Sequence, residues 1–597
     1  MLMSRLPPPR RRSLVLATAL LLAGCRGGHD ADQATPPPSV ASATPPSPAA
    51  AAAAFDAPSQ TLRLNIDGEM RPILPRAEKV HEMPLADADR RGRLNVALGL
   101  PSPDDPTSVR LDVSLRGDGR EDVLLERLDT STSGWHDLSV AVDAGGLTNP
   151  RLVIQRSVPS GNIGRLLRSV TSVPVLTREA PPGLPSVILF SLDTLRADRV
   201  GAYGDAAART PVLDALAQRG TLFTDAYSSS LWTLPSHTGL FYGTHLPDTP
   251  AGLRGQGRAE AALDIPALPL PELLRQQGYA TAAFTGGGFL APPFDFLRGF
   301  DVFYAFQQGH TKESCPPARF DGPEVFRRAE AWLRANTHRP FFLFVHTYDV
   351  HDRCPFVPPG SGEFGGWPEL DADRQAALQQ HYRDLIAETD GRVGALLAAL
   401  AASGTADRTL IVVTSDHGEA LSEHGQRGHS CSLRPYEEVS RVPLILQGGG
   451  RIPAGQRIET PVSLIDVAPT ILSLLDIAPP AWMAGRPLPG LGLAHPDPPP
   501  PVVVHCERQM ALRVGDAKLL TTYGAPERDE LYDLAGDPGE ARNRAAEDAD
   551  TLARLRALAA SAWVPSQFPP QAKPAPVDEG TLDPAARERL RALGYLQ

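Results

Sequence analysis

Two hydrophobic patterns divide the chain near residue 180. Between residues 55 and 177, apolar and polar positions alternate in short stretches, as at 62–66, 109–115 and 152–155. Alternation with a period of two residues is typical of strands that bury one face, so this part predicts a small β-sandwich. No group of catalytic side chains is visible there. Carbohydrate binding and spacing remain open roles, and structural support is the simplest expectation.

Beyond residue 180, continuous apolar runs alternate with helical segments. The runs lie at 187–192, 341–345 and 410–414, and the helical segments at 211–219, 323–336 and 378–402. Uniformly apolar strands are buried on both faces, which predicts an α/β fold with a mostly parallel central sheet. Strand-like stretches at 511–514, 518–523 and 530–534 predict a small C-terminal antiparallel sheet, and residues 584–596 predict a terminal helix.

The first residues predict export and lipid anchoring. Three arginines (Arg10, Arg11 and Arg12) precede an apolar run at 14–23, which is the pattern of a signal peptide and too short to span a membrane permanently. Cys25 directly follows small residues, as in a bacterial lipobox, so we expect it to be acylated. An ordinary secretory signal with an incidental cysteine is the alternative. By resemblance to lipoprotein sorting, Arg26 favours the outer membrane, so the expected location is the cell envelope.

Length, charge and cysteines narrow the remaining choices. A chain of 597 residues is too long for one ordinary core. The predicted parts are a signal peptide (1–25), an Ala/Pro-rich tether (26–54), the β-sandwich (55–180), a catalytic domain (181–498) and a C-terminal subdomain (499–597). A net charge of −11 argues against a nucleic-acid partner. Four further cysteines, Cys315, Cys354, Cys431 and Cys506, allow three complete disulfide pairings, which stay open.

Polar side chains follow each of the three apolar runs. Asp193 follows the first run, Asp416 and His417 follow the third, and the middle one continues through His346 to His351. Because ligands of open α/β sheets bind at the carboxyl ends of strands, we expect these side chains to converge. Two carboxylates and an imidazole can hold a divalent metal with open positions.

A candidate nucleophile lies at Thr233. Pro235 suits the first turn of a helix, which would place Thr233 at or just before the helix N-terminus. Unpaired N–H groups at that position favour an anion such as phosphate or sulfate. A hydroxyl is a poor nucleophile at neutral pH, but metal coordination lowers its pKa.

These motifs stand in the order found in the sulfatase family of the alkaline-phosphatase superfamily. Residues 187–198 resemble the opening of a sulfatase domain, and residues 232–243 resemble its nucleophile box. The resemblance implies an alkaline-phosphatase-like α/β sandwich from about residue 186 to the end. It implies that Asp193, Asp416, His417 and Thr233 bind a metal and that Thr233 is the nucleophile. It also implies pocket roles for His351 and His429, and a weaker one for His424, whereas His346 is expected only to pack.

Two departures from the family shift the expected chemistry. Thr233 stands where a sulfatase has the Cys or Ser that becomes formylglycine, and His237 replaces the arginine that helps hold the aldehyde. Asp416 is followed by His rather than Asn, which resembles the phosphate and phosphonate ester hydrolases and lipoteichoic-acid-synthase-like transferases of the superfamily. We therefore expect a Thr233-dependent hydrolase of phosphate or phosphonate esters, with sulfate esters open. His237, His351 and His429 are candidate catalytic residues beside Thr233.

The cofactor and partners follow from this interpretation. One divalent ion is expected, and Mn²⁺, Zn²⁺, Ca²⁺ and Mg²⁺ are all open; one histidine among oxygens favours Mn²⁺ or Zn²⁺. The substrate is expected to be a small-molecule, lipid or glycan ester, and the membrane a partner through acylated Cys25. A phospho- or sulfotransferase acting on envelope lipid or glycan, and a non-catalytic glycan-binding lipoprotein, are the alternatives.

Overall fold

The computed structural model describes most of the chain beyond residue 62. The described residues are 63–66, 68–75, 79–86, 90–101, 106–119, 122–159, 163–177, 183–245, 267–291, 296–306, 321–351, 356 and 370–562. They all belong to the compact unit Pro58–Gln597. The predicted signal peptide, tether and terminal helix lie outside them, as do Cys315 and Cys354. Among the helices of the described part, none has the length and apolar character needed to cross a membrane.

The three apolar runs form neighbouring parallel strands in the middle of an eleven-stranded sheet. They are β11 (Ser186–Leu192), β15 (Phe341–Thr347) and β16 (Thr409–Thr414), with β11 between the other two. On the β15 side, β13 (Ala280–Thr285) and β14 (Val302–Ala305) continue in the same direction. On the β16 side, β19 (Arg441–Gly448) runs antiparallel both to β16 and to the next strand, β12 (Thr221–Tyr227). The sheet is therefore mixed around a parallel centre.

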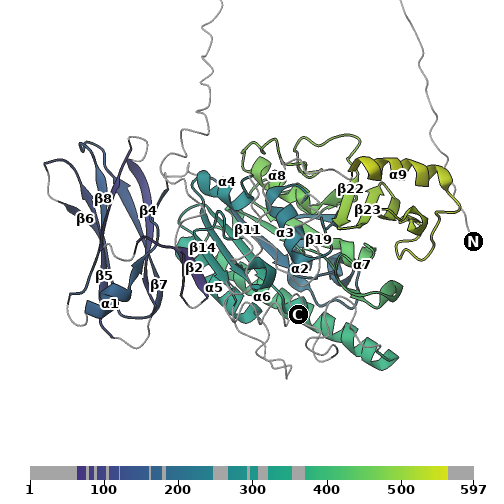
Figure 1. Cartoon of the computed structure of the whole chain (residues 1–597), viewed down its shortest axis with the longest axis horizontal. Coiled ribbons are helices and arrows are strands. Elements are labelled where there is room, and N and C mark those ends of the chain that lie inside the picture. The colour runs from purple at the N-terminus through teal and green to yellow at the C-terminus, as the bar shows by residue number, and fades with distance from the viewer. Residues whose placement is uncertain are drawn as a thin grey trace, which may run out of the picture. The chain divides into compact units, whose positions relative to one another are not determined.

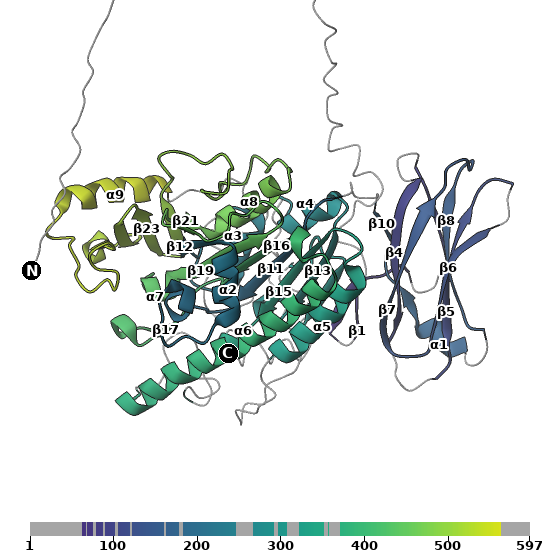
Figure 2. The same cartoon turned by 180° about the vertical axis from the view of Figure 1, so that it is seen from behind.

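Helices cover both faces of this sheet, as the apolar runs predicted. Val187 and Leu189 of β11 pack in one core with α3 (Thr233–Tyr242), α4 (Leu270–Gln276) and α8 (Val467–Leu474). Ile188 and Phe190 pack in the other core with α2 (Pro211–Arg219), α5 (Gly322–Asn336) and α6 (Ala372–Ala402) (Figures 1 and 2).

Helix α6 begins six residues before the predicted start at 378. Asp371 caps it, because its side chain accepts a hydrogen bond from the Arg374 N–H at 2.8 Å. The apolar periodicity starts only where the helix meets the core. The first turns, which are mostly exposed and carry no large apolar residue before 378, therefore escaped the prediction.

Two small antiparallel sheets form the expected sandwich. One contains β3 (Val80–Pro84), β8 (Arg151–Ser157), β5 (Val109–Arg116) and β6 (Val123–Thr130). The other contains β10 (Val175–Thr177), β4 (Arg91–Leu100), β7 (Gly134–Asp143) and the short β9 (Val170–Thr171). Side chains of β4 and β7 share one core with those of β5 and β8. Helix α1 (Ile163–Arg168) connects β8 to β9.

The first predicted sandwich strand belongs elsewhere. Residues 62–66 were expected in the sandwich, but β1 (Arg63–Ile66) pairs with β2 (Glu69–Pro72), and β2 pairs with β14 at the edge of the central sheet. The tight turn between them holds the hairpin together, since the Gly68 N–H donates to the Asn65 side chain at 2.8 Å. Alternation of apolar residues predicts a strand correctly but does not identify the neighbour with which it pairs.

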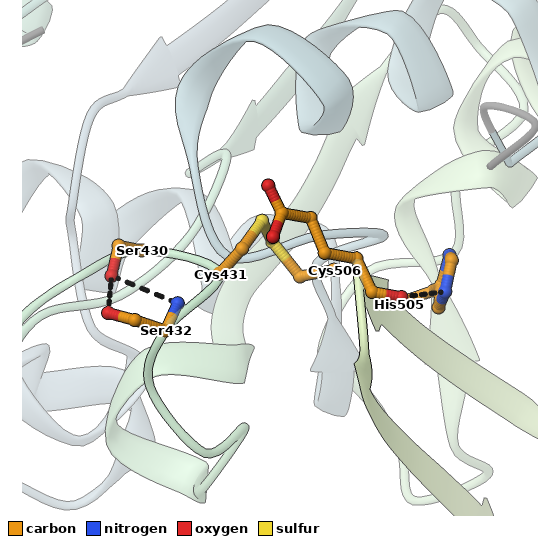
Figure 3. Close-up of a disulfide and its surroundings, with 6 residues drawn as sticks. Ser430, Cys431, Ser432, His505 and Cys506 are labelled. Atoms are coloured by element: carbon orange, nitrogen blue, oxygen red, sulfur yellow. Dashed lines mark hydrogen bonds between the residues drawn. A yellow bond between two sulfur atoms is a disulfide. The ribbon is translucent and has the colours of Figure 1, made fainter. Parts of the chain in front are cut away.

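The C-terminal part confirms the predicted antiparallel sheet. It contains β22 (Val502–Cys506), β23 (Gln509–Val514), β24 (Ala517–Thr522) and β25 (Glu530–Asp533), with α9 (Ala549–Ala562) packed on one face (Figure 1). The other face shares a core with β12 and with the segment that follows β16. A disulfide joins Cys506 of β22 to Cys431, in the loop after β18 (Arg427–Gly428) (Figure 3). One of the disulfide pairs left open by the sequence is thereby identified.

Candidate active site

The carboxylates predicted at the strand ends lie together. Asp193 follows β11 and Asp416 lies two residues beyond β16, and both side chains are fully buried. The strands end level, because Leu192 of β11 pairs with Thr347 and Ser191 pairs with Thr414. Ligand atoms of Asp193, Asp416 and His417 all lie within 4.8 Å of one another. The predicted convergence of these three residues is therefore present in the fold.

His417 faces this cluster with a nitrogen that carries a lone pair. Its Nδ1 lies 3.0 Å from the Gly418 carbonyl oxygen, which only accepts, so Nδ1 carries the proton. Burial lowers the pKa of His417 to about 4, so the ring is neutral at physiological pH. Its Nε2 lies 3.3 Å from Asp416 Oδ2.

Asp416 Oδ2 and His417 Nε2 form a pair of hydrogen-bond acceptors that face each other. Although burial opposes ionisation, the pKa of Asp416 lies below its usual range, since any proton on a neighbouring imidazole, His417 first, favours the carboxylate. Asp416 is therefore charged. Asp416 Oδ2 and His417 Nε2 are both buried, and neither takes a hydrogen bond within the described part of the chain. Two buried acceptors 3.3 Å apart are favourable only with a cation between them. The donor set thus fits a divalent metal.

Thr233 is the first residue of α3, as predicted. The helix begins there because Trp232 is extended, with φ −161° and ψ 164°. The Thr233 hydroxyl donates to Asp193 Oδ2 at 3.3 Å, and the side chain is fully buried. The hydroxyl therefore lies against a candidate metal ligand and at the positive end of a helix dipole.

His237 supports this turn with both ring nitrogens. Its Nδ1 donates to the Thr233 carbonyl oxygen at 2.8 Å, and its Nε2 lies 2.9 Å from Ser191 Oγ, from which it accepts. Burial lowers the pKa of His237, so it is neutral as well. Although ligand atoms of His237, His346 and Asp416 also lie within 4.8 Å of one another, His237 has no lone pair left for a metal. His237 therefore supports the turn that carries Thr233, the candidate nucleophile.

His346 has a contact that the sequence reasoning missed. It was expected only to pack at the strand end, but its Nε2 lies 3.3 Å from Asp193 Oδ2. The Gly286 N–H donates to its Nδ1 at 3.4 Å, so Nε2 carries the proton and donates to the carboxylate. A histidine that holds a ligating carboxylate in this way orients it toward the metal. Its place on the middle strand, level with Ser191, was the available signal.

His429 lies against His417, and His351 lies against His429. His351 belongs to the short helix η8 (Asp349–His351), and His429 follows β18. The ring of His429 lies 4.2 Å from that of His417 and 4.9 Å from that of His351, measured between centroids. The His429 Nδ1 lies 3.0 Å from Glu419 Oε2, a buried carboxylate that the sequence reasoning did not single out. Three imidazoles therefore form a row that starts at the metal cluster.

His424 has a different set of contacts. Its Nδ1 lies 2.9 Å from Glu438 Oε1, and its ring stacks on Tyr436 at 3.8 Å. Both partners lie in or next to α7 (Glu437–Ser440). This histidine holds the loop after β17 (Ala420–Leu421) against α7, which favours a structural role over the weaker pocket role considered from the sequence.

Comparisons with known proteins agree with this architecture. The sulfatase family matches residues 185–477. The ulvan-active sulfatase of Formosa agariphila is 26% identical, over 56% of this chain and 70% of its own length. Arylsulfatase K of Canis lupus familiaris is 25% identical, over 52% of this chain and 64% of its own length.

Two solved structures share the fold. A 2-O GAG sulfatase has a TM-score of 0.54 at 22% identity, and the match covers 64% of this chain and 92% of that one. The phosphonate monoester hydrolase of Agrobacterium radiobacter has a TM-score of 0.51 at 22% identity, covering 64% of this chain and 95% of that one. The homologues are sulfatases, that is, sulfuric ester hydrolases, which confirms the prediction of a hydrolase acting on ester bonds. The family match over residues 185–477 and the shared fold agree with the sulfatase resemblance and with the alkaline-phosphatase-like fold expected from the motifs.

Proposed function

We propose that this protein is a metal-dependent ester hydrolase with Thr233 as its nucleophile, and that phosphate or phosphonate esters are its preferred substrates. The observation that carries the proposal is the position of the Thr233 hydroxyl. It begins α3, is buried, and lies 3.3 Å from Asp193 Oδ2 beside Asp416 and His417. A hydroxyl in that position is directed at the place where a bound ester would meet the cation.

Asp193, Asp416, His417 and Thr233 would hold one divalent ion. Such an ion lowers the pKa of a coordinated hydroxyl and neutralises charge on the transferred group. Oxygen donors with a single imidazole favour Mn²⁺ or Zn²⁺, whereas the family resemblance favours Ca²⁺. His346 and Ser191 act indirectly, through Asp193 and His237 respectively.

The reaction would have two displacements at phosphorus. In the first, Thr233 Oγ1 would give its proton to Asp193 Oδ2, which accepts its hydrogen bond, and would bond to phosphorus. The ester P–O bond would break, and the leaving alkoxide would take a proton from His351 or His429. In the second, a water oxygen would bond to phosphorus and the water would give a proton back to that histidine. The bond between Thr233 Oγ1 and phosphorus would break, and Oγ1 would regain its proton from Asp193. N–H groups at the start of α3 would stabilise the equatorial oxygens.

Thr233 also explains why phosphoryl substrates are favoured. A threonine cannot become formylglycine, so release of sulfate through an aldehyde hydrate is closed to this chain. A phospho-threonine can instead be hydrolysed by attack at phosphorus. Sulfate esters on glycans are the competing substrates, because the relatives include an ulvan-active sulfatase and the neighbours a 2-O GAG sulfatase. A phosphonate monoester hydrolase shares the fold to a similar degree.

The test compares matched aryl esters on the full-length protein loaded with Mn²⁺, Zn²⁺ or Ca²⁺. Phosphate monoester, phosphate diester, phosphonate ester and sulfate ester are assayed with wild type, Thr233→Ala and Thr233→Ser. We expect phosphoryl or phosphonyl cleavage that the alanine abolishes and the serine retains in part. Full activity of Thr233→Ala would exclude the nucleophile, and Thr233-dependent cleavage of sulfate alone would exclude the substrate preference. A modified acceptor in place of free acid would identify a transferase.

We further propose that the protein is lipid-anchored in the cell envelope through Cys25. The support is the basic, apolar and small-residue pattern of residues 10–25. Cys25→Ser is expected to move the protein from the membrane fraction to the soluble fraction. Retention of that variant in the membrane fraction would exclude the anchor.

A further inference from the structure

The turn after β11 is strained at Thr194. Its φ is 59°, a left-handed conformation, and among the residues that the structure describes it is the only β-branched one with a positive φ. Crowding at Cβ makes this conformation unfavourable for such residues. Strain of this kind persists only where the surroundings hold it in place.

The strained conformation links the backbone of Asp193 to the carboxylate of Asp416. The Thr194 hydroxyl donates to the Asp193 carbonyl at 2.7 Å, and the Thr194 N–H lies 3.4 Å from Asp416 Oδ1, to which it donates. If Thr194 relaxed to negative φ, the peptide between Asp193 and Thr194 would rotate. The bond to Asp416 would then be lost, and the Asp193 carboxylate would point elsewhere.

A tyrosine from a distant helix holds this turn from behind. Tyr382 of α6 is buried, and its hydroxyl donates to the Thr194 carbonyl at 2.5 Å. The same hydroxyl accepts from the Arg196 N–H at 3.0 Å. One phenol oxygen thus bridges the backbone on both sides of Leu195, and its hydrogen bonds are to this turn rather than to a candidate metal ligand.

We propose that Tyr382 is a positioning residue for the metal centre, and that it acts by holding Thr194 in the conformation that aims Asp193 at Asp416 and His417. The inference rests on the metal centre of the proposed function. Because Tyr382 acts through the backbone, its removal changes metal binding without removing a ligand. Groups that hydrogen-bond to metal ligands tune metal affinity, and Tyr382 would act one step further out, through Thr194.

The test measures metal affinity rather than turnover. Mn²⁺ and Zn²⁺ are titrated calorimetrically into metal-free full-length protein carrying Tyr382→Phe, which keeps the ring and loses the hydroxyl. We expect binding about 10- to 100-fold weaker than in wild type.

Tyr203→Phe is the matched control. The Tyr203 hydroxyl likewise bridges backbone groups, donating to the Phe223 carbonyl at 3.0 Å and accepting from the Leu444 N–H at 2.7 Å. It should lower the melting temperature and leave metal affinity unchanged.

A second variant tests the role of strain. Glycine adopts a positive φ without cost, so Thr194→Gly should need no clamp. In that background the further loss of affinity caused by Tyr382→Phe should fall below about threefold, since coupled residues are not additive.

Three outcomes would overturn the inference. They are wild-type affinity in Tyr382→Phe, an equal loss of affinity in Tyr203→Phe, and a full effect of Tyr382→Phe in the Thr194→Gly background. Wild-type protein that bound neither metal would refute the metal centre itself, and this inference with it.

Discussion

Replacing the buried Lys518 should destabilise the protein strongly and in a pH-dependent way. Lys518 lies on β24 and is fully buried, and its Nζ lies 2.8 Å from Glu437 Oε1 and 2.9 Å from Glu540 Oε1. Glu437 begins α7, whose Glu438 and Val439 carbonyls accept from the Glu419 and Gly418 N–H groups. This lysine therefore connects the C-terminal sheet to the segment that follows His417.

The expected magnitude follows from the charges left behind. Lys518→Met keeps the length of the side chain but leaves two carboxylates without their cation, and breaking a buried ion pair costs about 3–5 kcal/mol. Protonation can relieve part of this cost. Burial, only partly offset by Lys518, already raises the pKa of Glu540 from 4.5 to about 7, and loss of Lys518 would raise it further.

That raised pKa gives the deficit its pH dependence. A group whose folded pKa lies above its unfolded value contributes stability that is complete below the unfolded pKa and is lost as the pH rises through the folded pKa. The variant can therefore recover stability by binding a proton in mildly acidic solution but not in alkaline solution. Its deficit should grow from about pH 6 to about pH 8.

Urea denaturation at these two pH values measures the deficit. Arg451→Met is the control, because its ion pair with Asp476 is exposed and such pairs contribute about 0–1 kcal/mol. If Lys518→Met were as stable as Arg451→Met at about pH 8, the reasoning from buried charge would be wrong. A deficit that shrank as the pH rose would contradict the assignment to Glu540.

Further predictions concern a second buried carboxyl, the metal and the disulfide. Burial and neighbouring Asp321 raise the pKa of Asp349 from 3.8 to about 7, so the stability contributed by its bound proton is lost as the pH rises through that value. In Asp349→Asn the melting temperature should depend less on pH between about pH 5 and pH 8, and an unchanged pH profile would contradict this. Removal of metal by a chelator should lower the melting temperature, and added metal should restore it. At a metal concentration of about 1,000 times Kd the gain in the free energy of unfolding should be about 4 kcal/mol, and insensitivity to chelator would exclude a bound ion. The paired replacement of Cys431 and Cys506 by serine should lower the free energy of unfolding by about 2–4 kcal/mol. It should lower kcat more than metal affinity, because the loop that the disulfide holds carries His429 rather than a candidate metal ligand; equal losses of kcat and metal affinity would refute this.

The sequence predicted the parts of the fold that depend on burial. Runs buried on both faces identified β11, β15 and β16, and helical periodicity identified α2 and α5. Strand direction and partnership depend on the path of the chain between elements. For that reason the antiparallel β19 and the placement of β1 were not predicted, although both segments have ordinary strand patterns.

Much of the candidate site was predicted because it lies on backbone positions. Strand ends bring Asp193, Asp416 and His417 together, and a helix start places Thr233 beside them. The contacts that the sequence reasoning missed depend on where a side chain points across the fold. The His346 contact to Asp193 and the Glu419 contact to His429 are of this kind, and spacing along the chain does not reveal them.

Substrate preference must likewise come from side chains rather than from the fold. The 2-O GAG sulfatase and the phosphonate monoester hydrolase resemble this chain almost equally, with TM-scores of 0.54 and 0.51, so the architecture favours neither ester. The proposed nucleophile, Thr233, differs in kind from that of the sulfatases, because a threonine can form a phosphate ester that water can open but forms no aldehyde. His237 continues the difference, since both of its nitrogens are bonded within the turn that carries Thr233, where the family has an arginine for the aldehyde. Thr233 and His237, one helical turn apart, thus both depart from the residues that serve the aldehyde, and this shared direction is the reason for proposing transfer at phosphorus.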